Sequence, residues 1–177
     1  MQERTGIITM KGKPLTLLGT TPRVGDKAPD FVVLDSGLAE KSLKDYAGKV
    51  KVLSVAPSLD TPVCSLQLRW FNEDAAQEPG DVVVLNLTMD LPFAIKRFCA
   101  VEGIENAIAL SDHRTASFGT AYGVLIKELR LLTRSVFIVD KDDVVRYVQV
   151  VPEVTDEPNY EDAVEALKKL QIGRAHV

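Results

Sequence analysis

The sequence predicts an α/β domain with a central mixed β-sheet and helices on both of its faces. Buried-type strands alternate with helical patterns through the middle of the chain, a hairpin precedes them, and a strand pair and a last helix follow. The chain has 177 residues, a length typical of one domain with its own hydrophobic core. It contains no internal repeat, low-complexity tract or interdomain linker. We therefore expect a single domain over residues 1–171.

Hydrophobic periodicity and turn residues define the expected elements. An apolar run, a Lys-Gly-Lys-Pro turn and a second apolar run predict a β-hairpin over residues 6–18. Apolar runs of strand length predict buried strands at 51–56, 82–87 and 107–110. The other expected segments are a turn-rich stretch at 25–31, a turn and loop at 42–48, a short helix at 115–122, strands at 135–140 and 144–151 joined by a Lys-Asp-Asp turn, and a closing helix at 160–170.

Two longer helices are expected between the central strands. The first covers residues 62–78, with Asp60 or Thr61 as its cap and Pro79-Gly80 as its end. The second covers residues 92–101, and its apolar residues recur at the i, i+3 and i+4 spacing of one helix face.

The last six residues are interpreted as a separate segment. Residues 172–177 follow the expected end of the closing helix and match the translation of a common sequencing adaptor in one reading frame. We therefore interpret 172–177 as a non-native tail and exclude His176 from any site. His113 is then the one remaining histidine, which argues against a histidine-based metal site.

Composition and charge argue against several classes of protein. The net charge of −4 leaves no basic surplus to neutralise phosphates, so nucleic acid is not an expected partner. No stretch approaches the roughly 20 apolar residues that span a bilayer, and the N-terminal residues lack the apolar segment of a secretion signal. We therefore expect a cytoplasmic protein without membrane contact. Two cysteines in a reducing compartment favour a catalytic pair over a structural disulfide.

The most informative stretch joins a buried strand to a helix. It reads Pro-Ser-Leu-Asp-Thr-Pro-Val-Cys and places Cys64 in the first helical turn. Free backbone N–H groups and the helix dipole favour an anion there, so the reactive thiolate of Cys64 is favoured. Thr61 can cap the helix or hydrogen-bond the sulfur, and Pro57 can restrict and shield the loop. An unreactive Cys64 is the alternative, because free cysteines often pack as small hydrophobic residues.

The functional interpretation of Cys99 and of Arg134 depends on Cys64. Considered alone, Cys99 lies on an apolar helix face and is expected to pack in the core. Considered together with Cys64, which lies 35 residues before it (99 − 64), it could be the thiol that condenses with a sulfenic acid. A disulfide needs Cα atoms within about 7 Å, so we expect one or both helices to unwind locally on oxidation. Arg134 opens an apolar strand, and it either reaches solvent or stabilises the thiolate through its planar donors.

Several motifs together resemble the peroxiredoxins, and in particular their thiol peroxidase branch, the atypical two-cysteine peroxiredoxins. The pattern Pro57-x-x-x-Thr61-x-x-Cys64 matches the peroxiredoxin active-site motif at each defining position. The likeness runs over residues 6–170, but Ser65 and Gln67 stand where family members often carry acidic residues. Further similar segments are 90–94, 96–99, 110–114, 118–119, 122–124 and 151–155.

The resemblance implies a thioredoxin-like fold preceded by the N-terminal β-hairpin. It implies that Cys64 attacks the peroxide and that Cys99 resolves it through an intramolecular disulfide. Thr61, Arg134 and Pro57 would complete the site. It further implies reduction of hydrogen peroxide and organic hydroperoxides to water and alcohols, recycling by thioredoxin, a role in antioxidant defence and redox homeostasis, and a homodimer. No metal or organic cofactor is implied.

Other functions fit some of the same residues. A redox sensor on this fold would keep both cysteines but turn over slowly, which steady-state peroxide consumption would reveal. A binding or chaperone module in which both cysteines merely pack would leave Cys64 unactivated, which a thiol titration would reveal. The Ser-Asp-His-Arg stretch at 111–114 contains hydrolase residue types, but the chain has no G-x-S-x-G elbow, and His113 is interpreted as structural.

Overall fold

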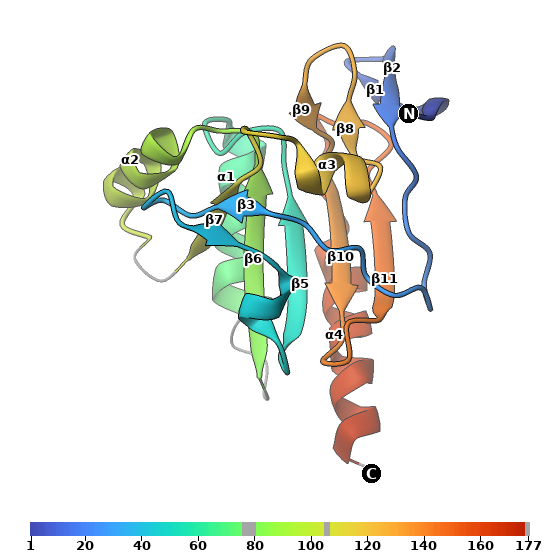
Figure 1. Ribbon diagram of the computed structural model, residues 1–177, viewed down its shortest axis with the longest axis vertical. Helices are drawn as coiled ribbons and strands as arrows, with labels where there is room; N and C mark the ends of the chain where they lie inside the picture. The colour runs from blue at the N-terminus through green and yellow to red at the C-terminus, as the bar shows by residue number, and fades with distance from the viewer. Residues whose placement is uncertain (76–80, 105–106, 176–177) are drawn as a thin grey trace.

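The structure, a computed structural model, describes residues 1–75, 81–104 and 107–175 (Figure 1). Strands and helices alternate through the middle of the chain, as the sequence predicts. In chain order the elements are β1 (Glu3–Met10), β2 (Lys13–Leu18), β3 (Val33–Leu34), β4 (Glu40–Lys41), the 3₁₀ helix η1 (Leu43–Tyr46), β5 (Val50–Val55), α1 (Pro62–Trp70), the π-helix η2 (Phe71–Ala75), β6 (Val82–Thr88), α2 (Pro92–Glu102), β7 (Ile108–Ser111), α3 (Ser117–Ala121), β8 (Leu125–Ile126), β9 (Leu131–Leu132), β10 (Ser135–Val139), β11 (Val145–Val150) and α4 (Tyr160–Ala175).

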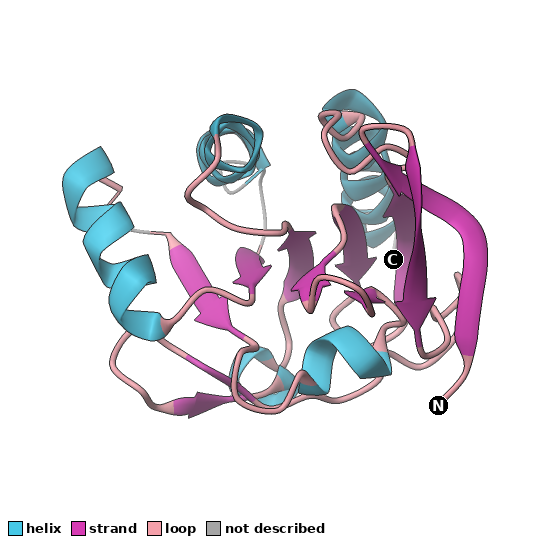
Figure 2. Ribbon diagram, turned by 90° about the horizontal axis from the view of Figure 1, so that it is seen from above, coloured by secondary structure: helices cyan, strands magenta, loops and turns pink. Residues whose placement is uncertain are grey.

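A seven-stranded mixed sheet forms the centre of the molecule. Its strands follow the order β11-β10-β5-β6-β7-β3-β4, with β5, β6 and β7 parallel and β10 antiparallel to β5. Helices lie on both sides of this sheet (Figure 2), which buries β5 along its whole length. The predicted fold class is therefore confirmed.

Alternate residues of the central strands enter two separate cores. One core lies on the side of α3 and η1 and contains a group of aromatic rings that includes Phe118 and Tyr122. The other lies under α1, η2 and α4. There Trp70 stacks on Tyr160 with the ring centroids 4.6 Å apart, which ties the end of α1 to the start of α4.

The N-terminal hairpin belongs to a second, smaller sheet. Strands β1 and β2 pair antiparallel, as predicted, and the sheet continues through β8 and β9. The hairpin is also bonded to the segment that follows β11: the Thr9 amide donates to the Pro152 carbonyl at 2.8 Å, and the Val154 amide donates to the Thr9 carbonyl at 2.9 Å. The carboxylate of Glu153 accepts from the Gly12 amide at 2.9 Å.

Several boundaries differ from those predicted. Helix α1 continues as a π-helix over Phe71–Ala75, and the expected helix end at 78–80 lies outside the described residues. Residues 42–48 contain a 3₁₀ helix rather than only a turn and loop, because Ser42 and Asp45 form a capping box there.

The expected end of the closing helix is wrong. Helix α4 begins at Tyr160 as predicted but runs to Ala175, beyond residue 171. The first residues after 171 therefore continue a helix instead of following one. The interpretation of 172–177 as a non-native tail stays a prediction, and residues 176–177 lie outside the described part.

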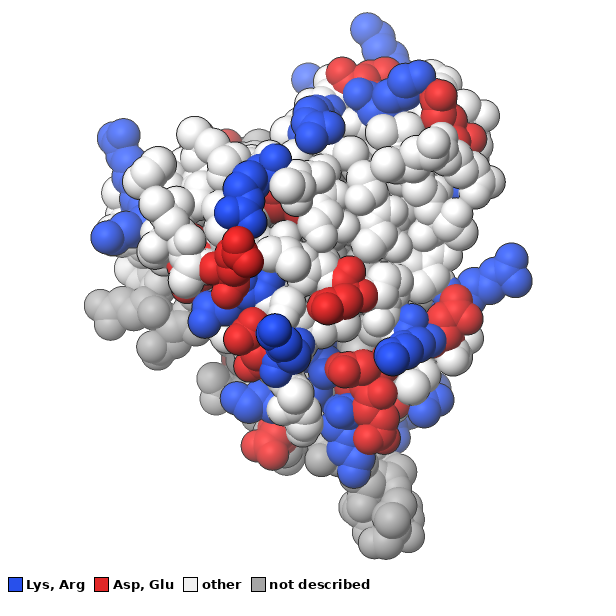
Figure 3. Space-filling model, viewed as in Figure 1, with Lys and Arg blue, Asp and Glu red and all other residues white. Residues whose placement is uncertain are grey.

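Two surface properties complete the description of the fold. In the ranges that the structure describes, every helix is too short or too polar to span a bilayer. On the face drawn in Figure 3, lysine and arginine side chains are interspersed with acidic ones rather than gathered into a patch of one sign.

Glu153 makes the attachment of the hairpin dependent on pH. Hydrogen bonds from the Thr155 hydroxyl and from the Gly12 amide lower the pKa of Glu153 from 4.5 to about 2. A depressed acid pKa means that these contacts stabilise the folded state above about pH 4.5 and are lost as the pH falls toward 2.

We therefore expect Glu153→Gln to lower the melting temperature at pH 7. The gap between wild type and variant should shrink steadily below pH 4.5 and close near pH 2, as followed by circular dichroism. A gap of equal size at pH 7 and pH 2.5 would contradict this origin.

Candidate active site

Cys64 lies in the first turn of α1, directly after the loop that leaves β5. Its side chain is buried, with 1% of its surface exposed. Thr61 is the N-cap residue: its backbone is extended, and its hydroxyl accepts from the Cys64 amide at 3.4 Å. Pro62 follows in the first helical position, where its missing N–H costs nothing. Of the two predicted caps, the structure selects Thr61 over Asp60.

The Thr61 hydroxyl acts on the backbone around Cys64. Besides accepting from the Cys64 amide, it donates to the Ser58 carbonyl at 3.4 Å. Within the described residues it makes no hydrogen bond to the sulfur. Pro57 is buried at the start of the same loop, and its proposed shielding of the sulfur stays a prediction.

Arg134 contacts the sulfur of Cys64 although the two residues lie 70 positions apart in the sequence. It directly precedes β10, next to the end of β5, and only 3% of its surface is exposed. Its Nη2 lies 3.2 Å from Cys64 Sγ, its Nη1 donates to Gln67 Oε1 at 2.9 Å, and its Nε donates to the Val154 carbonyl at 2.8 Å. The alternative in which Arg134 reaches solvent is therefore wrong.

The charge of Arg134 has no acidic partner among the described residues. Gln67 and Val154 offer neutral oxygens, so the third contact, Cys64 Sγ, is the one group that can become an anion. A buried guanidinium remains charged and is costly to bury unless an opposite charge compensates it. The guanidinium of Arg134 is therefore shared between two neutral oxygens and the Cys64 sulfur.

Gln67 is a site residue that sequence reasoning missed. It is buried, and its amide nitrogen donates to Ser54 Oγ at 2.9 Å and to the Val55 carbonyl at 3.1 Å. These two bonds fix its oxygen toward Arg134. The available signal was its position three residues after Cys64, which places both side chains on one helix face.

Cys99 lies on α2 and is half-buried in a small apolar cluster. The cluster joins α1, α2 and β7 through Leu68, Ile95 and Ala109, with Phe98 and Cys99 packed against it. Burial raises the pKa of the Cys99 thiol, so this thiol is held in its neutral form. Cys64 and Cys99 are both free thiols in this structure.

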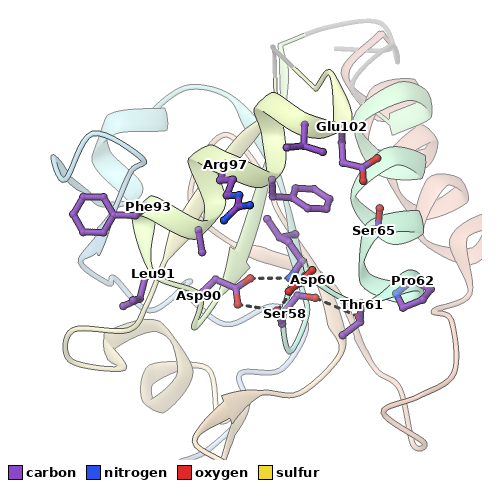
Figure 4. Close-up of a pocket in the computed structure, with 14 residues that line it drawn as sticks. Ser58, Asp60, Thr61, Pro62, Ser65, Asp90, Leu91, Phe93, Arg97 and Glu102 are labelled. Carbon is purple, nitrogen blue, oxygen red and sulfur yellow. Dashed lines mark hydrogen bonds between the residues drawn. The ribbon is translucent and has the colours of Figure 1, made fainter.

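A cleft of about 990 Å³ separates the start of α1 from α2 (Figure 4). Its polar side contains Ser58, Thr61 and Asp90, whereas its rim includes strongly exposed apolar side chains. Phe93 and Val101 on this rim are 69% and 75% exposed. The full lining is Ser58, Leu59, Asp60, Thr61, Pro62, Ser65, Asp90, Leu91, Phe93, Ala94, Arg97, Phe98, Val101 and Glu102.

The Ser-Asp-His-Arg stretch is structural rather than a hydrolase triad. Ser111 Oγ donates to the Asp90 carbonyl, and the Asp112 carboxylate accepts from the amides of Phe118 and Gly119 at 2.9 and 2.8 Å. Burial raises the pKa of Asp112 to about 6 even though these amides oppose the shift. The described residues contain no group of three His, Cys, Asp or Glu side chains that could hold a metal ion.

Comparison with known proteins agrees with this geometry. Residues 23–164 match the family model described as Redoxin. A thiol peroxidase of Listeria innocua is 57% identical over 162 residues, which cover 92% of this chain and 98% of that protein. A thiol peroxidase of Bacillus subtilis is 55% identical over 163 residues, which cover 92% of this chain and 97% of that protein.

Solved structures show the same likeness. A peroxiredoxin-like protein from Aquifex aeolicus superposes with a TM-score of 0.85 at 44% identity, covering 96% of this chain and 99% of that chain. A thiol peroxidase from Chromobacterium violaceum shares the fold, with a TM-score of 0.80 at 23% identity and coverage of 96% and 98%.

The chain therefore belongs to the redoxin family of thioredoxin-fold proteins. Within that family its relatives place it among the thiol peroxidases, so it is a peroxidase of the peroxiredoxin type. The resemblance inferred from the sequence motifs is confirmed.

The cap at Thr61 makes a prediction about stability. Thr61→Ala removes the side chain that accepts from the Cys64 amide, so we expect a loss of about 1 kcal/mol in the free energy of unfolding. Thr61→Ser keeps the hydroxyl and should lose much less. Urea denaturation of both variants measures the difference, and equal losses would show that the hydroxyl is not the cap.

Proposed function

We propose that Cys64 is the thiol that attacks the peroxide and that Arg134 stabilises its thiolate. One observation carries this proposal: a buried guanidinium without an acidic partner among the described residues lies 3.2 Å from Cys64 Sγ. The alternative is a binding module in which both cysteines merely pack. That alternative does not explain why a charged group is buried against Cys64, although such burial is costly.

The first step transfers two electrons from sulfur to the peroxide. The Cys64 thiolate attacks the terminal peroxide oxygen, an S–O bond forms and the O–O bond breaks. The sulfur becomes a sulfenic acid, and the departing alkoxide or hydroxide takes up a proton to leave as an alcohol or water. Negative charge moves onto the leaving oxygen, where Arg134 and free N–H groups at the start of α1 can stabilise it.

The second step forms the disulfide between Cys64 and Cys99. The Cys99 thiol condenses with the sulfenic acid, an S–S bond forms, and the hydroxyl leaves as water with the thiol proton. Both cysteines lie on helices, and Cys99 is packed in an apolar cluster. We therefore keep the expectation that one or both helices unwind locally before the sulfurs meet.

We further propose the substrates, reductant, assembly and location. The apolar rim of the cleft suits organic hydroperoxides as well as hydrogen peroxide. Thioredoxin, a dithiol protein, would restore both cysteines by thiol–disulfide exchange. Exposed Leu66, Leu91 and Phe93 give the surface apolar side chains that a homodimer could bury. Two free thiols fit the reducing cytoplasm.

The cysteine roles are tested by coupled turnover. NADPH oxidation is followed with thioredoxin, thioredoxin reductase and cumene hydroperoxide for wild type, Cys64→Ser and Cys99→Ser. We expect turnover by wild type, none by Cys64→Ser, and loss of thioredoxin-linked turnover by Cys99→Ser. An active Cys64→Ser variant would refute the proposal, whereas one slow, stoichiometric turnover by wild type would indicate a redox sensor.

The role of Arg134 is tested by Arg134→Lys. Lysine keeps the charge but cannot contact Val154, Gln67 and Cys64 together through a planar fork. We expect the second-order rate constant of Cys64 with peroxide to fall by about 10²-fold, measured by stopped flow. Arg146→Lys, a change at an exposed arginine paired with Asp140, is the matched control and should leave the rate constant unchanged. Equal rate constants for wild type and Arg134→Lys would exclude Arg134 from the reaction.

A further inference from the structure

We propose that Asp90 is a positioning residue that holds the loop before Cys64 in its reactive arrangement and must release it before the disulfide forms. The proposal rests on the proposed roles of Cys64 and Cys99. Asp90 lies between the end of β6 and the start of α2, so it immediately precedes the helix that carries Cys99.

Both carboxylate oxygens of Asp90 face the loop that leads to Cys64. Asp90 Oδ1 accepts from Ser58 Oγ at 2.8 Å, and Oδ2 accepts from the Leu59 amide at 2.7 Å (Figure 4). Ser58 Oγ also accepts from the Asp60 amide at 3.1 Å. The side chain of Asp90 therefore fixes the residues that immediately precede the Thr61 cap of α1.

The main chain of Asp90 is fixed to the central sheet. Its amide donates to Thr88 Oγ1 at 3.1 Å, and its carbonyl accepts from Ser111 Oγ at 2.5 Å. Thr88 and Ser111 are buried and pair with each other across β6 and β7. Asp90 is thus a rigid support whose carboxylate reaches toward a loop, and the loop is the part that can move away.

The far ends of the two helices are joined by a different contact. Arg69 at the end of α1 pairs with the Glu102 carboxylate at the end of α2 and donates to the Glu102 carbonyl at 3.3 Å. Both side chains are more than a third exposed, and ion pairs of this kind contribute little to stability. The half-buried Asp90 contacts are therefore the stronger of these two polar connections across the cleft.

The two chemical steps require opposite states of this connection. Peroxide attack needs Cys64 held against Arg134 in the intact first turn of α1, which the loop contacts of Asp90 support. Disulfide formation needs the sulfurs of Cys64 and Cys99, which are separate free thiols here, to come within about 2 Å, and we propose that the loop and the start of α1 make this movement. The loop cannot move away from α2 without breaking the hydrogen bonds of Asp90. Asp90 should therefore favour the first step and slow the second.

The test uses Asp90→Asn and the fluorescence of Trp70. Asparagine has the same shape but no charge, and its NH2 group can only donate where aspartate accepts, so the two charge-assisted hydrogen bonds to the loop are weakened. Trp70 is the single tryptophan of the chain and lies at the end of α1 stacked on Tyr160, so its emission should report movement of α1. Stopped flow with hydrogen peroxide then resolves attack and disulfide formation as successive phases, assigned by mass spectrometry of quenched samples.

We expect attack to slow and disulfide formation to accelerate, each by about fivefold in Asp90→Asn, in line with the weakening of charge-assisted hydrogen bonds. Faster disulfide formation should also lower the fraction of Cys64 that a second peroxide oxidises to sulfinic acid. The control is Asp142→Asn in the turn between β10 and β11, which lines no part of the cleft and should change neither phase.

Each other outcome overturns one claim alone. If wild type shows both phases but Asp90→Asn changes them in the same direction or not at all, Asp90 is only structural, and the roles of the cysteines stand. If wild type shows no reaction, the proposed function itself fails. Should Asp90→Asn not fold, Ser58→Ala removes one of the same two bonds and must give the same opposite changes.

Discussion

The contact between Arg134 and the Cys64 sulfur is the interaction on which the site depends. Arg134 is 3% exposed, and a guanidinium buried to this extent needs hydrogen-bond acceptors for its donor groups. Two distant segments of the chain meet to supply them: helix α1 through Gln67 and Cys64, and the segment after β11 through the Val154 carbonyl. The architecture around the site is largely a means of holding these three groups in place.

The smaller sheet takes part in this support. The carbonyl that accepts from Arg134 belongs to Val154, and the amide of the same residue donates to Thr9 in the N-terminal hairpin. Glu153 adds further bonds to Thr9 and Gly12. The hairpin therefore fixes the backbone oxygen that orients the arginine, which links an element remote in sequence to the geometry at the sulfur.

The position of the second cysteine follows from the parallel strands. Because β5 and β6 are parallel neighbours, the loop that leads to Cys64 and the turn at Asp90 leave the same edge of the sheet. This brings α1 and α2 side by side with a cleft between them, and the Cys99 thiol is kept neutral by partial burial. The two cysteines are thus held on neighbouring helices as separate free thiols.

The sequence by itself determined the local features: the buried strands, the hairpin at the N-terminus, and the start of α1 at Pro62, two residues before Cys64. These depend on spacing along a few residues, so periodicity and capping rules suffice. Four two-residue strands, β3, β4, β8 and β9, were not predicted, because so short a segment has no period and exists only through its partner.

Tertiary structure decided where the Arg134 side chain points and which groups accept its hydrogen bonds. A residue beside a strand can face solvent or the interior, and only the order of strands in the sheet settles which neighbours it has. The same reason hid the roles of Gln67 and Asp90: their partners lie on other elements, Arg134 being 67 positions from Gln67 and Ser58 being 32 from Asp90. Sequence spacing selected Cys64 as the candidate reactive cysteine, and the packing of the sheet placed Arg134 against its sulfur.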